Sequence, residues 1–431
     1  MKKVCIIGAG SSGITAVKTL LENGIAVDCY EKGSKIGGVW RYNNDNGVSS
    51  AYRSLHINTN RKVMAYSDFP MPNDYPMFPH HSHIIKYFDD YAEHFNLLEH
   101  ITFNTAVSKI TKIQDGYKVA LSNGSIKEYE HVIVANGHHW NPRLPKPPFK
   151  GNFTGEIIHS HYYKEFEQVK NKDVLIVGIG NSAVDIACEA ARLHTGKVVI
   201  STRSGAYILP NWIWSMPFDN LANPLTNKLP MVVQRLLLKV ALWLAHGNQE
   251  DYGVPKPNRP LLKEHPTLSQ DLLNLAGRGL IKFKPNIKEL KGKTVVFEDG
   301  NSQDFDMLIY ATGYKITFPF LKHHDEFDVE ETNQIALYKH MIHPEFENLF
   351  FLALLQPLGA IMPLAEVQSK WIAKIISGEC GLADKEKMQW AIAKETQKLK
   401  SRYGEAPRHT LQVDFFHYKN MVEGMMNKYK N

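Results

Sequence analysis

The chain has 431 residues, which is too many for one hydrophobic core and predicts roughly two or three domains. Hydrophobic residues make up 43% of it and charged residues 22%, as in an ordinary soluble globular protein. The net charge of +6 is spread along the chain, which fits local phosphate sites and gives no support for nucleic-acid binding, since that requires a concentrated basic face.

The first expected element is a strand that leads into a glycine cluster, in the stretch KKVCIIGAGSSGIT. An apolar run, a tight glycine turn and helix-forming residues, in this order, are typical of a helix N-terminus that receives a pyrophosphate. A carboxylate closes the next apolar run, IAVDCYEK, at the distance at which such folds bind ribose hydroxyls. The residues expected to bind this dinucleotide are Gly8, Gly10, Ser11, Ser12, Gly13 and Glu31.

A second pair of glycines follows in GSKIGGVW. Gly37 and Gly38 let the backbone approach a flat ring system, and Trp40 offers a face to it. A surface turn with an aromatic anchor is the alternative interpretation. We expect Gly38, Val39 and Trp40 to contact the cofactor at the first site.

The four cysteines form no CxxC pair and have no metal-ligand spacing. Cys5 and Cys29 fall in the first two expected strands, where buried thiols are the simpler interpretation. This usage indicates a reducing compartment. The two pairs of neighbouring histidines in the first 140 residues lack further ligands at suitable spacing, so no metal site is expected.

A second copy of the glycine pattern occurs in DVLIVGIGNSAVDIACEAA. Gly178 and Gly180 form its turn, and Ala183 takes the third glycine position, where a small residue lets helix and strand pack closely. Asn181 and Ser182 open the expected helix and complete this second candidate nucleotide site.

Each copy ends in similar sequence, GYKVALSNGSIKEYEHVIVANG over 116–137 and GKTVVFEDGNSQDFDMLIYATG over 292–313. Both predict a hairpin, turning at Asn123-Gly124 or Asp299-Gly300, and then an apolar strand that ends in small residues. The predicted fold class is α/β, with two nested Rossmann-like dinucleotide-binding domains.

The two expected sites differ at the strand end that contacts the ribose. The step of 23 residues from the first glycine to the carboxylate leads, in the second copy, to Ser201 in VVISTRSG. A carboxylate repels a 2′-phosphate, whereas Ser201, Thr202 and Arg203 favour one. The first site therefore predicts FAD and the second NADPH, held by Arg203 and Ser204. An exposed arginine without a ligand is the alternative interpretation.

The order of these blocks predicts that one domain is inserted into the other. We expect a FAD-binding domain in two parts, residues 1–156 and 293–431, around an NADPH-binding domain, residues 157–292. The Pro-rich stretch NPRLPKPPFKG is expected to lead from the first part of the FAD-binding domain into the NADPH-binding domain. The stretch NLFFLALLQPLGA is similar to a last strand that returns to the first domain.

Two apolar stretches, MVVQRLLLKVALWLAH from residue 231 and LFFLALLQPLGAIMPLA, are interrupted by charged residues or by prolines. Neither supplies the ~20 uninterrupted apolar residues of a membrane span, and no leader peptide is expected before the first strand. For the stretch from 231 we favour a packed lid or core helix over contact with a membrane surface. A cytoplasmic location is expected.

The stretch FTGEIIHSHYY places Phe153, Gly155, His159 and Tyr163 in the spacing FxGxxxHxxxY. In this motif the chain resembles the class B flavin-containing monooxygenases, whose Baeyer–Villiger relatives carry tryptophan at the last position. Nearly the whole chain is similar to that family, in the blocks GGVW, INTNRKVMAYSDFPMP, GIGNSA, KEHPT, LIYATGY and LLQPLGAIMPLAEVQSKW. The membrane tail of vertebrate members is missing, so the likeness is to the soluble microbial type.

The resemblance implies an enzyme in which NADPH reduces FAD and the reduced flavin captures O₂ as a C4a-hydroperoxide. NADP⁺ stays bound to shield it, and an amine nitrogen or sulfide sulfur takes the distal oxygen. The family's flavin-side asparagine falls on Asn58, the expected catalytic residue, although a turn-forming role is the alternative. A further flavin contact falls on Gln356, and His159 and Tyr163 brace the linker and the nicotinamide site.

Two other functions stay open: a Baeyer–Villiger ketone monooxygenase, disfavoured by Tyr163, and a non-catalytic nucleotide-binding redox sensor. The substrate pocket is expected within residues 205–265, where Trp212, Trp214 and Phe218 suit either a lid or an amine cage. The expected partners are a small amine or sulfide and O₂, without nucleic acid or a transmembrane segment. A homodimer is compatible with the sequence.

Overall fold

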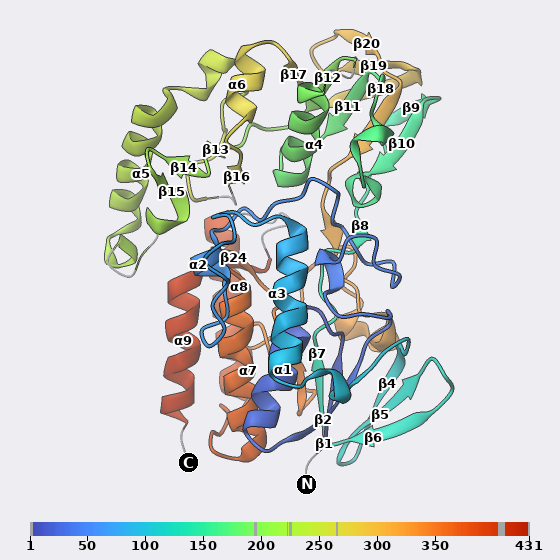
Figure 1. Cartoon of the computed structure of the whole chain (residues 1–431), viewed down its shortest axis with the longest axis vertical. Helices are drawn as coiled ribbons and strands as arrows, with labels where there is room; N and C mark the ends of the chain where they lie inside the picture. Colours follow the sequence, from blue (N-terminus) through green and yellow to red (C-terminus); the bar gives the residue numbers. More distant parts are fainter. Residues whose placement is uncertain are drawn as a thin grey trace. The chain divides into compact units, whose positions relative to one another are not determined.

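The computed structural model describes residues 3–193, 196–221, 223, 226–263, 266–403 and 410–429. The chain forms two compact units, and Figure 1 labels many of their helices and strands. Unit 1 comprises Met1–Ala51, Leu55–Asn141 and Lys315–Asn431; unit 2 comprises Tyr52–Ser54 and Pro142–Tyr314.

Unit 1 is built on a parallel sheet with the strand order β23-β7-β1-β2-β3. Side chains of β1, β7 and β23 are almost all buried, as expected of parallel strands covered on both faces. The strand expected to return to the first domain is β23, which pairs with β7. The strands are β1 (Lys3–Ile7), β2 (Ala26–Tyr30), β3 (Ile101–Thr102), β7 (His131–Val134) and β23 (Leu349–Phe351).

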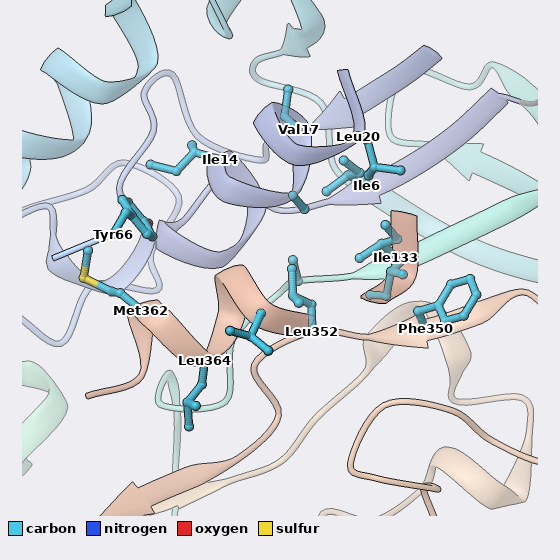
Figure 2. Packing of buried hydrophobic residues seen from close by; sticks show 14 of the residues in the cluster. Ile6, Ile14, Val17, Leu20, Tyr66, Ile133, Phe350, Leu352, Met362 and Leu364 are labelled. Atoms are coloured by element: carbon cyan, nitrogen blue, oxygen red, sulfur yellow. The ribbon is translucent and has the colours of Figure 1, made fainter. Parts of the chain in front are cut away.

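The helices of unit 1 pack through apolar side chains. Figure 2 shows Ile6 of β1, Ile14 of α1 and Leu364 of α7 within one buried cluster. Each such side chain contributes about 1.5–3 kcal/mol on burial. Helix α1 contacts α7, and α7 contacts α9. The helices are α1 (Ser11–Glu22), α2 (Arg61–Met64), α3 (His81–His94), α7 (Met362–Ser377), α8 (Lys385–Tyr403) and α9 (Phe415–Lys428).

Two smaller sheets complete unit 1. The antiparallel strands β4 (Val107–Ile113), β5 (Gly116–Leu121) and β6 (Ile126–Tyr129) contain the hairpin predicted to turn at Asn123-Gly124. Near the end of the chain, β24 (Gln356–Leu358) pairs in parallel with β25 (Gln412–Asp414).

Unit 2 repeats the plan, with a parallel sheet in the order β10-β21-β11-β12-β17. In both sheets the strand before the glycine turn, β1 or β11, lies between the next strand in the chain and the strand after the hairpin. This shared order confirms the predicted duplication. The strands are β10 (Glu156–His159), β11 (Val174–Val177), β12 (Val198–Ser201), β17 (Ile281–Lys284) and β21 (Met307–Tyr310).

A second sheet of unit 2 has the order β20-β19-β18-β9 and includes the hairpin predicted at Asp299-Gly300. Helix α4 follows β11, and α6 precedes β17. Two short strands, β8 and β22, pair where the chain enters and leaves the unit. The bounds are β8 (Asn141–Pro142), β9 (Lys150–Phe153), β18 (Ile287–Gly292), β19 (Thr294–Phe297), β20 (Ser302–Asp304), β22 (Tyr314–Lys315), α4 (Asn181–Arg192) and α6 (Leu272–Gly277).

The bounds of the compact units differ from those expected for the nucleotide-binding domains. Residues 142–156 and 293–314, expected in the first domain, belong to unit 2. The reason is strand pairing, because β9 pairs with β18 and β21 pairs with both β10 and β11. Each copy thus keeps its own hairpin and closing strand.

The apolar stretch from residue 231 forms α5 (Met231–His246) of unit 2. Leu242 is the one buried side chain of this helix, whereas Val232, Leu236 and Trp243 are more than half exposed. The core helix, one of the two alternatives favoured from the sequence, is therefore wrong, and the lid stays a prediction. Around α5 lie the short strand pairs β13 (Ile208–Leu209) with β16 (Thr267–Leu268) and β14 (Trp212–Ile213) with β15 (Met216–Pro217).

Within the described ranges, no helix combines the length and the apolar composition that crossing a membrane requires.

Candidate active site

The first glycine turn connects β1 to α1 and is fixed by close backbone contacts. Gly8 has a φ of +98°, and a Cβ there would lie 2.8 Å from the carbonyl oxygen of Ala135. A Cβ on Gly13 would lie 1.9 Å from the carbonyl oxygen of Gly8. Both positions therefore require glycine for α1 to lie this close to β1.

The N-terminus of α1 has the features of an anion site. Gly10 is the N-cap, no side chain caps the helix, and its first turn, which contains Ser11 and Ser12, carries no acidic residue. The first N–H groups of a helix have no acceptor within the helix, and the helix dipole favours negative charge there. A pyrophosphate fits these donors.

The GG pair predicted to contact a ring lies against this turn. The N–H of Gly37 donates to the carbonyl oxygen of Ala9 at 3.0 Å. A Cβ on Gly38 would lie 3.3 Å from the Cα of Gly10, so the two turns approach through backbone alone. Val39 and Trp40, the next two residues, are half-buried.

Glu31 is buried at the end of β2, where its carboxylate joins three segments. Oε2 accepts the Ala9 N–H at 2.8 Å; Oε1 accepts the Gly33 N–H at 2.8 Å and the Asn46 Nδ2–H at 2.9 Å. A carboxylate offers about four acceptor positions, so one stays available for a ribose hydroxyl. Asn46 was missed from the sequence, because no motif or periodicity marks it.

Asn58 and Asn60 have different roles in the loop before α2. Asn60 is buried and caps α2, since its Oδ1 accepts the N–H groups of Lys62 at 3.0 Å and Val63 at 3.2 Å. Asn58 is half-buried, and its side chain makes no hydrogen bond to the described residues. Its amide is therefore free to bind a cofactor, unlike that of its neighbour.

Gln356 begins β24 in the same unit. Its N–H donates to the carbonyl oxygen of Leu411 at 2.7 Å, which fixes the backbone. The half-buried side chain has no hydrogen-bond partner in the part of the chain that the structure describes. It fits a flavin contact in the same way as Asn58.

The second glycine turn connects β11 to α4 and repeats the first. Gly178 has a φ of +122°, and a Cβ there would lie 2.5 Å from the carbonyl oxygen of Ala311. A Cβ on Gly180, the N-cap of α4, would meet no described atom within 4 Å, so this side of the turn is open to a ligand. Ala183 is fully buried, as expected of the third position.

The first two residues of α4 are half-buried, and one of them is partly engaged. The Oδ1 of Asn181 accepts the N–H of Leu268 in β16 at 2.8 Å. Ser182 makes no side-chain hydrogen bond to a described residue. As in α1, no side chain caps the helix and no acidic residue lies in its first turn.

The residues predicted at the ribose end of this site differ in whether their side chains are already bonded within the protein. The Ser201 hydroxyl donates to the carbonyl oxygen of Pro285 at 2.8 Å, and that of Thr202 donates to the carbonyl oxygen of Ser204 at 2.6 Å. Arg203 is exposed and has no ion-pair partner among the described residues. The guanidinium is therefore the group available for a 2′-phosphate.

The FxGxxxHxxxY motif is largely structural in this geometry. Tyr163 is fully buried and donates its hydroxyl to Glu189 Oε2 at 2.6 Å. Burial and the neighbouring His161 lower the pKa of His159 to about 4, so its ring is neutral near pH 7. A Cβ on Gly155 would lie 2.5 Å from the carbonyl oxygen of Asp306.

Sequence reasoning also missed Tyr52 and Asp185, whose side chains meet in unit 2 with 2.5 Å between Tyr52 Oη and Asp185 Oδ2. Their only sequence signal is the pair Asp185 and Glu189, charged residues one turn apart within the otherwise apolar stretch 183–191 of α4.

The expected substrate region carries exposed aromatic residues. Trp212 and Trp214 are 37% and 69% exposed, whereas Phe218 packs against a small cluster around Leu242 of α5. Of the family-like block KEHPT, residues 264 and 265 lie outside the described residues.

The chain is similar in sequence to known monooxygenases. Dimethylaniline monooxygenase [N-oxide-forming] 2 of Oryctolagus cuniculus is 36% identical, over 97% of this chain and 81% of its own. Flavin-containing monooxygenase 5 of Rattus norvegicus is 38% identical, over 96% of this chain and 80% of its own.

Among solved structures, S-allyl-L-cysteine S-oxygenase of Allium sativum has a TM-score of 0.72 at 24% identity, over 99% of this chain and 88% of its own. Cyclohexanone monooxygenase in an open form has a TM-score of 0.70 at 16% identity, over 99% of this chain and 98% of its own. These two likenesses concern the fold. The model of the family "Flavin-binding monooxygenase-like" matches residues 1–430, and the chain belongs to that family.

Proposed function

We propose that the chain is an NADPH- and O₂-dependent monooxygenase that oxygenates an amine nitrogen or a sulfide sulfur. The observation that carries this is the difference between two similar glycine turns, of which one ends at the Glu31 carboxylate and the other at the free Arg203 guanidinium. Overall, NADPH, H⁺, O₂ and the substrate give NADP⁺, water and the oxygenated substrate. An N-oxide-forming relative and an S-oxygenase of the same fold support this substrate class.

Unit 1 is the proposed FAD-binding unit. The first turn of α1 binds the pyrophosphate, Glu31 accepts a ribose hydroxyl, and the half-buried Trp40 lies along the flavin. The proposed FAD-binding residues are Gly8, Gly10, Ser11, Ser12, Gly13, Glu31, Gly38, Val39, Trp40 and Gln356.

Unit 2 is the proposed NADPH-binding unit. Its open turn at Gly180 lets the backbone approach the pyrophosphate, and Arg203 pairs with the 2′-phosphate. Tyr163 supports this unit from within through Glu189. The proposed residues are Tyr163, Gly178, Gly180, Asn181, Ser182, Arg203 and Ser204.

The chemistry of bound FAD is to take a hydride from NADPH and to activate O₂ for transfer to a soft nucleophile. The chain contributes binding, orientation and the exclusion of water. Asn58 is the proposed catalytic residue, because its free amide can donate an N–H to the flavin side of the site. That donor disfavours the release of the activated oxygen as hydrogen peroxide.

Glu31→Ala is expected to weaken FAD retention. It removes a charged acceptor for the ribose, worth about 1.5–3 kcal/mol, which raises the dissociation constant roughly ten- to a hundredfold. FAD content after gel filtration and titration of apoprotein with FAD measure this. Glu31→Ala protein that retains one FAD per chain after extensive dialysis contradicts the assignment.

Asn46→Ala is the control, because it removes one donor to Glu31 and leaves the carboxylate in place. We expect Asn46→Ala to lose little FAD and Glu31→Ala to lose much of it. This difference would show that Glu31 binds the ribose and does not act only by fixing the conformation of the turn.

Oxygen uptake with NADPH, measured with trimethylamine, a thioether, indole and a cyclic ketone, tests the proposed reaction. We expect an N-oxide or S-oxide to form in proportion to the NADPH consumed. A lactone or ester from the ketone, with no product from amine or thioether, would indicate the Baeyer–Villiger alternative. NADPH oxidation that no substrate converts into product contradicts both.

A cytoplasmic location belongs to this proposal and is supported by four free, buried cysteines. A homodimer is likewise proposed, and light scattering on the purified protein tests it.

A further inference from the structure

Three residues of the chain, Tyr52–Ser54, belong to unit 2, although the residues on both sides, Ala51 and Leu55, belong to unit 1. We name Tyr52–Ser54 the crossing segment. The chain thus passes through unit 2 shortly before the loop that carries Asn58. Side-chain and backbone hydrogen bonds attach the crossing segment to the rest of unit 2.

The side chain of Tyr52 is the main attachment. It is 7% exposed, and its hydroxyl donates to Asp185 Oδ2 of α4 at 2.5 Å. Its ring lies against that of Tyr163, with 5.9 Å between the centroids. Burial and then Asp185 raise the pKa of Tyr52 well above its usual value, so the hydroxyl stays a donor.

The carboxylate that accepts this bond is fixed in turn. Asp185 and Glu189 are one turn apart on α4, and Glu189 accepts the hydroxyl of Tyr163. Desolvation raises the pKa of Asp185 to about 6, so the group is ionised near pH 7 and its bond to Tyr52 is charge-assisted. Two tyrosines and two carboxylates therefore form one contact region on unit 2.

The backbone of the crossing segment is attached as well. The N–H of Arg53 donates to the carbonyl oxygen of Lys164 at 2.7 Å, directly after Tyr163. The Arg53 guanidinium lies 3.3 Å from Glu165, but this pair is exposed and adds little. The end of the FxGxxxHxxxY motif thus holds the crossing segment.

Beyond the crossing segment, the chain is fixed within unit 1. The carbonyl oxygen of Leu55 accepts the N–H of His81 at 2.9 Å, and the N–H of Ile57 donates to the carbonyl oxygen of Pro79 at 3.0 Å. Asn58 follows at once. The loop that carries it therefore begins with backbone that is hydrogen-bonded within unit 1, and it directly follows the crossing segment in the chain.

We propose that Tyr52 is a positioning residue, which through Asp185 fixes the crossing segment that directly precedes the loop carrying Asn58 in the chain. The proposal rests on the function proposed above for Asn58. Loss of the attachment frees the crossing segment without touching either glycine turn, so FAD binding is retained while the alignment of Asn58 is lost. Oxygen transfer then competes less well with peroxide release.

The experiment compares Tyr52→Phe with Tyr117→Phe in the holoenzyme. Tyr117 is a control, because it is also a buried tyrosine and donates its hydroxyl to the carbonyl oxygen of Glu347, without contact to the crossing segment among the described hydrogen bonds. Two ratios are measured: hydrogen peroxide formed per NADPH consumed, and the exchange rate of the Arg53 amide hydrogen relative to wild type.

We expect the exchange of the Arg53 amide to accelerate about ten- to a hundredfold in Tyr52→Phe, as for loss of one buried charge-assisted bond. The peroxide ratio should rise several-fold at unchanged FAD content. Tyr117→Phe should match wild type in both. Asp185→Asn keeps an acceptor oxygen, so its peroxide ratio should stay closer to wild type than that of Asp185→Leu.

If the Arg53 amide of Tyr52→Phe exchanges at the wild-type rate, the Tyr52 hydroxyl does not fix the crossing segment and the proposal is overturned. Faster exchange with an unchanged peroxide ratio overturns the positioning role. The double variant Tyr52→Phe/Asp185→Leu should be no worse than the worse single one, because both delete the same bond, and additive losses also overturn the proposal. A wild-type enzyme that forms no oxygenated product is a failure of the proposed function instead, and is recognised in the wild type alone.

Discussion

Asn58→Leu is expected to consume NADPH at nearly the wild-type rate and to release most of the O₂ it takes up as hydrogen peroxide. Flavin reduction depends on the two nucleotides, whereas retention of activated oxygen depends on donors and on excluded water. Loss of one preorganised donor typically lowers the step it serves by about a hundredfold, so oxygenated product should fall on this scale. Product, peroxide and NADPH measured in one reaction give the result.

Asn60→Ala is the control for Asn58→Leu. It removes the cap of α2, typically worth about 1 kcal/mol, so the melting temperature should fall while product per NADPH stays at the wild-type value. If Asn58→Leu instead loses FAD and its flavin is reduced slowly, Asn58 has the role of a turn-forming residue. Unchanged product formation in folded Asn58→Leu places the catalytic amide elsewhere.

Arg203→Ala should raise the KM for NADPH by about ten- to a hundredfold and hardly alter that for NADH. The charge-assisted bond to a 2′-phosphate is worth roughly 1.5–3 kcal/mol, and NADH has no such phosphate. Because Arg203 is exposed, the difference between the coenzymes should shrink with added salt. Steady-state kinetics with both coenzymes at two ionic strengths measure it.

Arg278→Ala is the matched control, since Arg278 is also an exposed arginine of unit 2 without an ion pair to a described residue. Its coenzyme preference should equal that of wild type. Equal losses with NADPH and NADH in Arg203→Ala would show that Arg203 supports the fold and not the phosphate.

The family, the duplicated fold and the cofactors could be predicted from the sequence because each depends on local pattern. Gly8 and Gly178 have the positive φ that the turns require, and the two hairpins lie where Asn123-Gly124 and Asp299-Gly300 indicate. Membership of a flavin-binding monooxygenase family confirms the predicted enzyme class and disfavours a non-catalytic redox sensor.

Contacts between distant segments could not be predicted. A residue type shows which hydrogen bonds a side chain can make, but not which it makes: the Ser201 hydroxyl, expected at the phosphate, donates to Pro285. Asn46 reaches Glu31 across 15 positions, and Tyr52 reaches Asp185 across 133. Hydrophobicity predicted the helix α5 but not its exposure, because a run of apolar residues does not show whether a partner covers them.

The pairing of β8 with β22 brings the two ends of Pro142–Tyr314 together. A stretch of chain whose ends are neighbours can be exchanged as a cassette, since the rest of the chain meets the same two attachment points. Natural or engineered recombination could thus give one flavin unit a new coenzyme preference in a single event. The crossing segment limits this freedom, because a transplanted unit must also supply the acceptor for the Tyr52 hydroxyl.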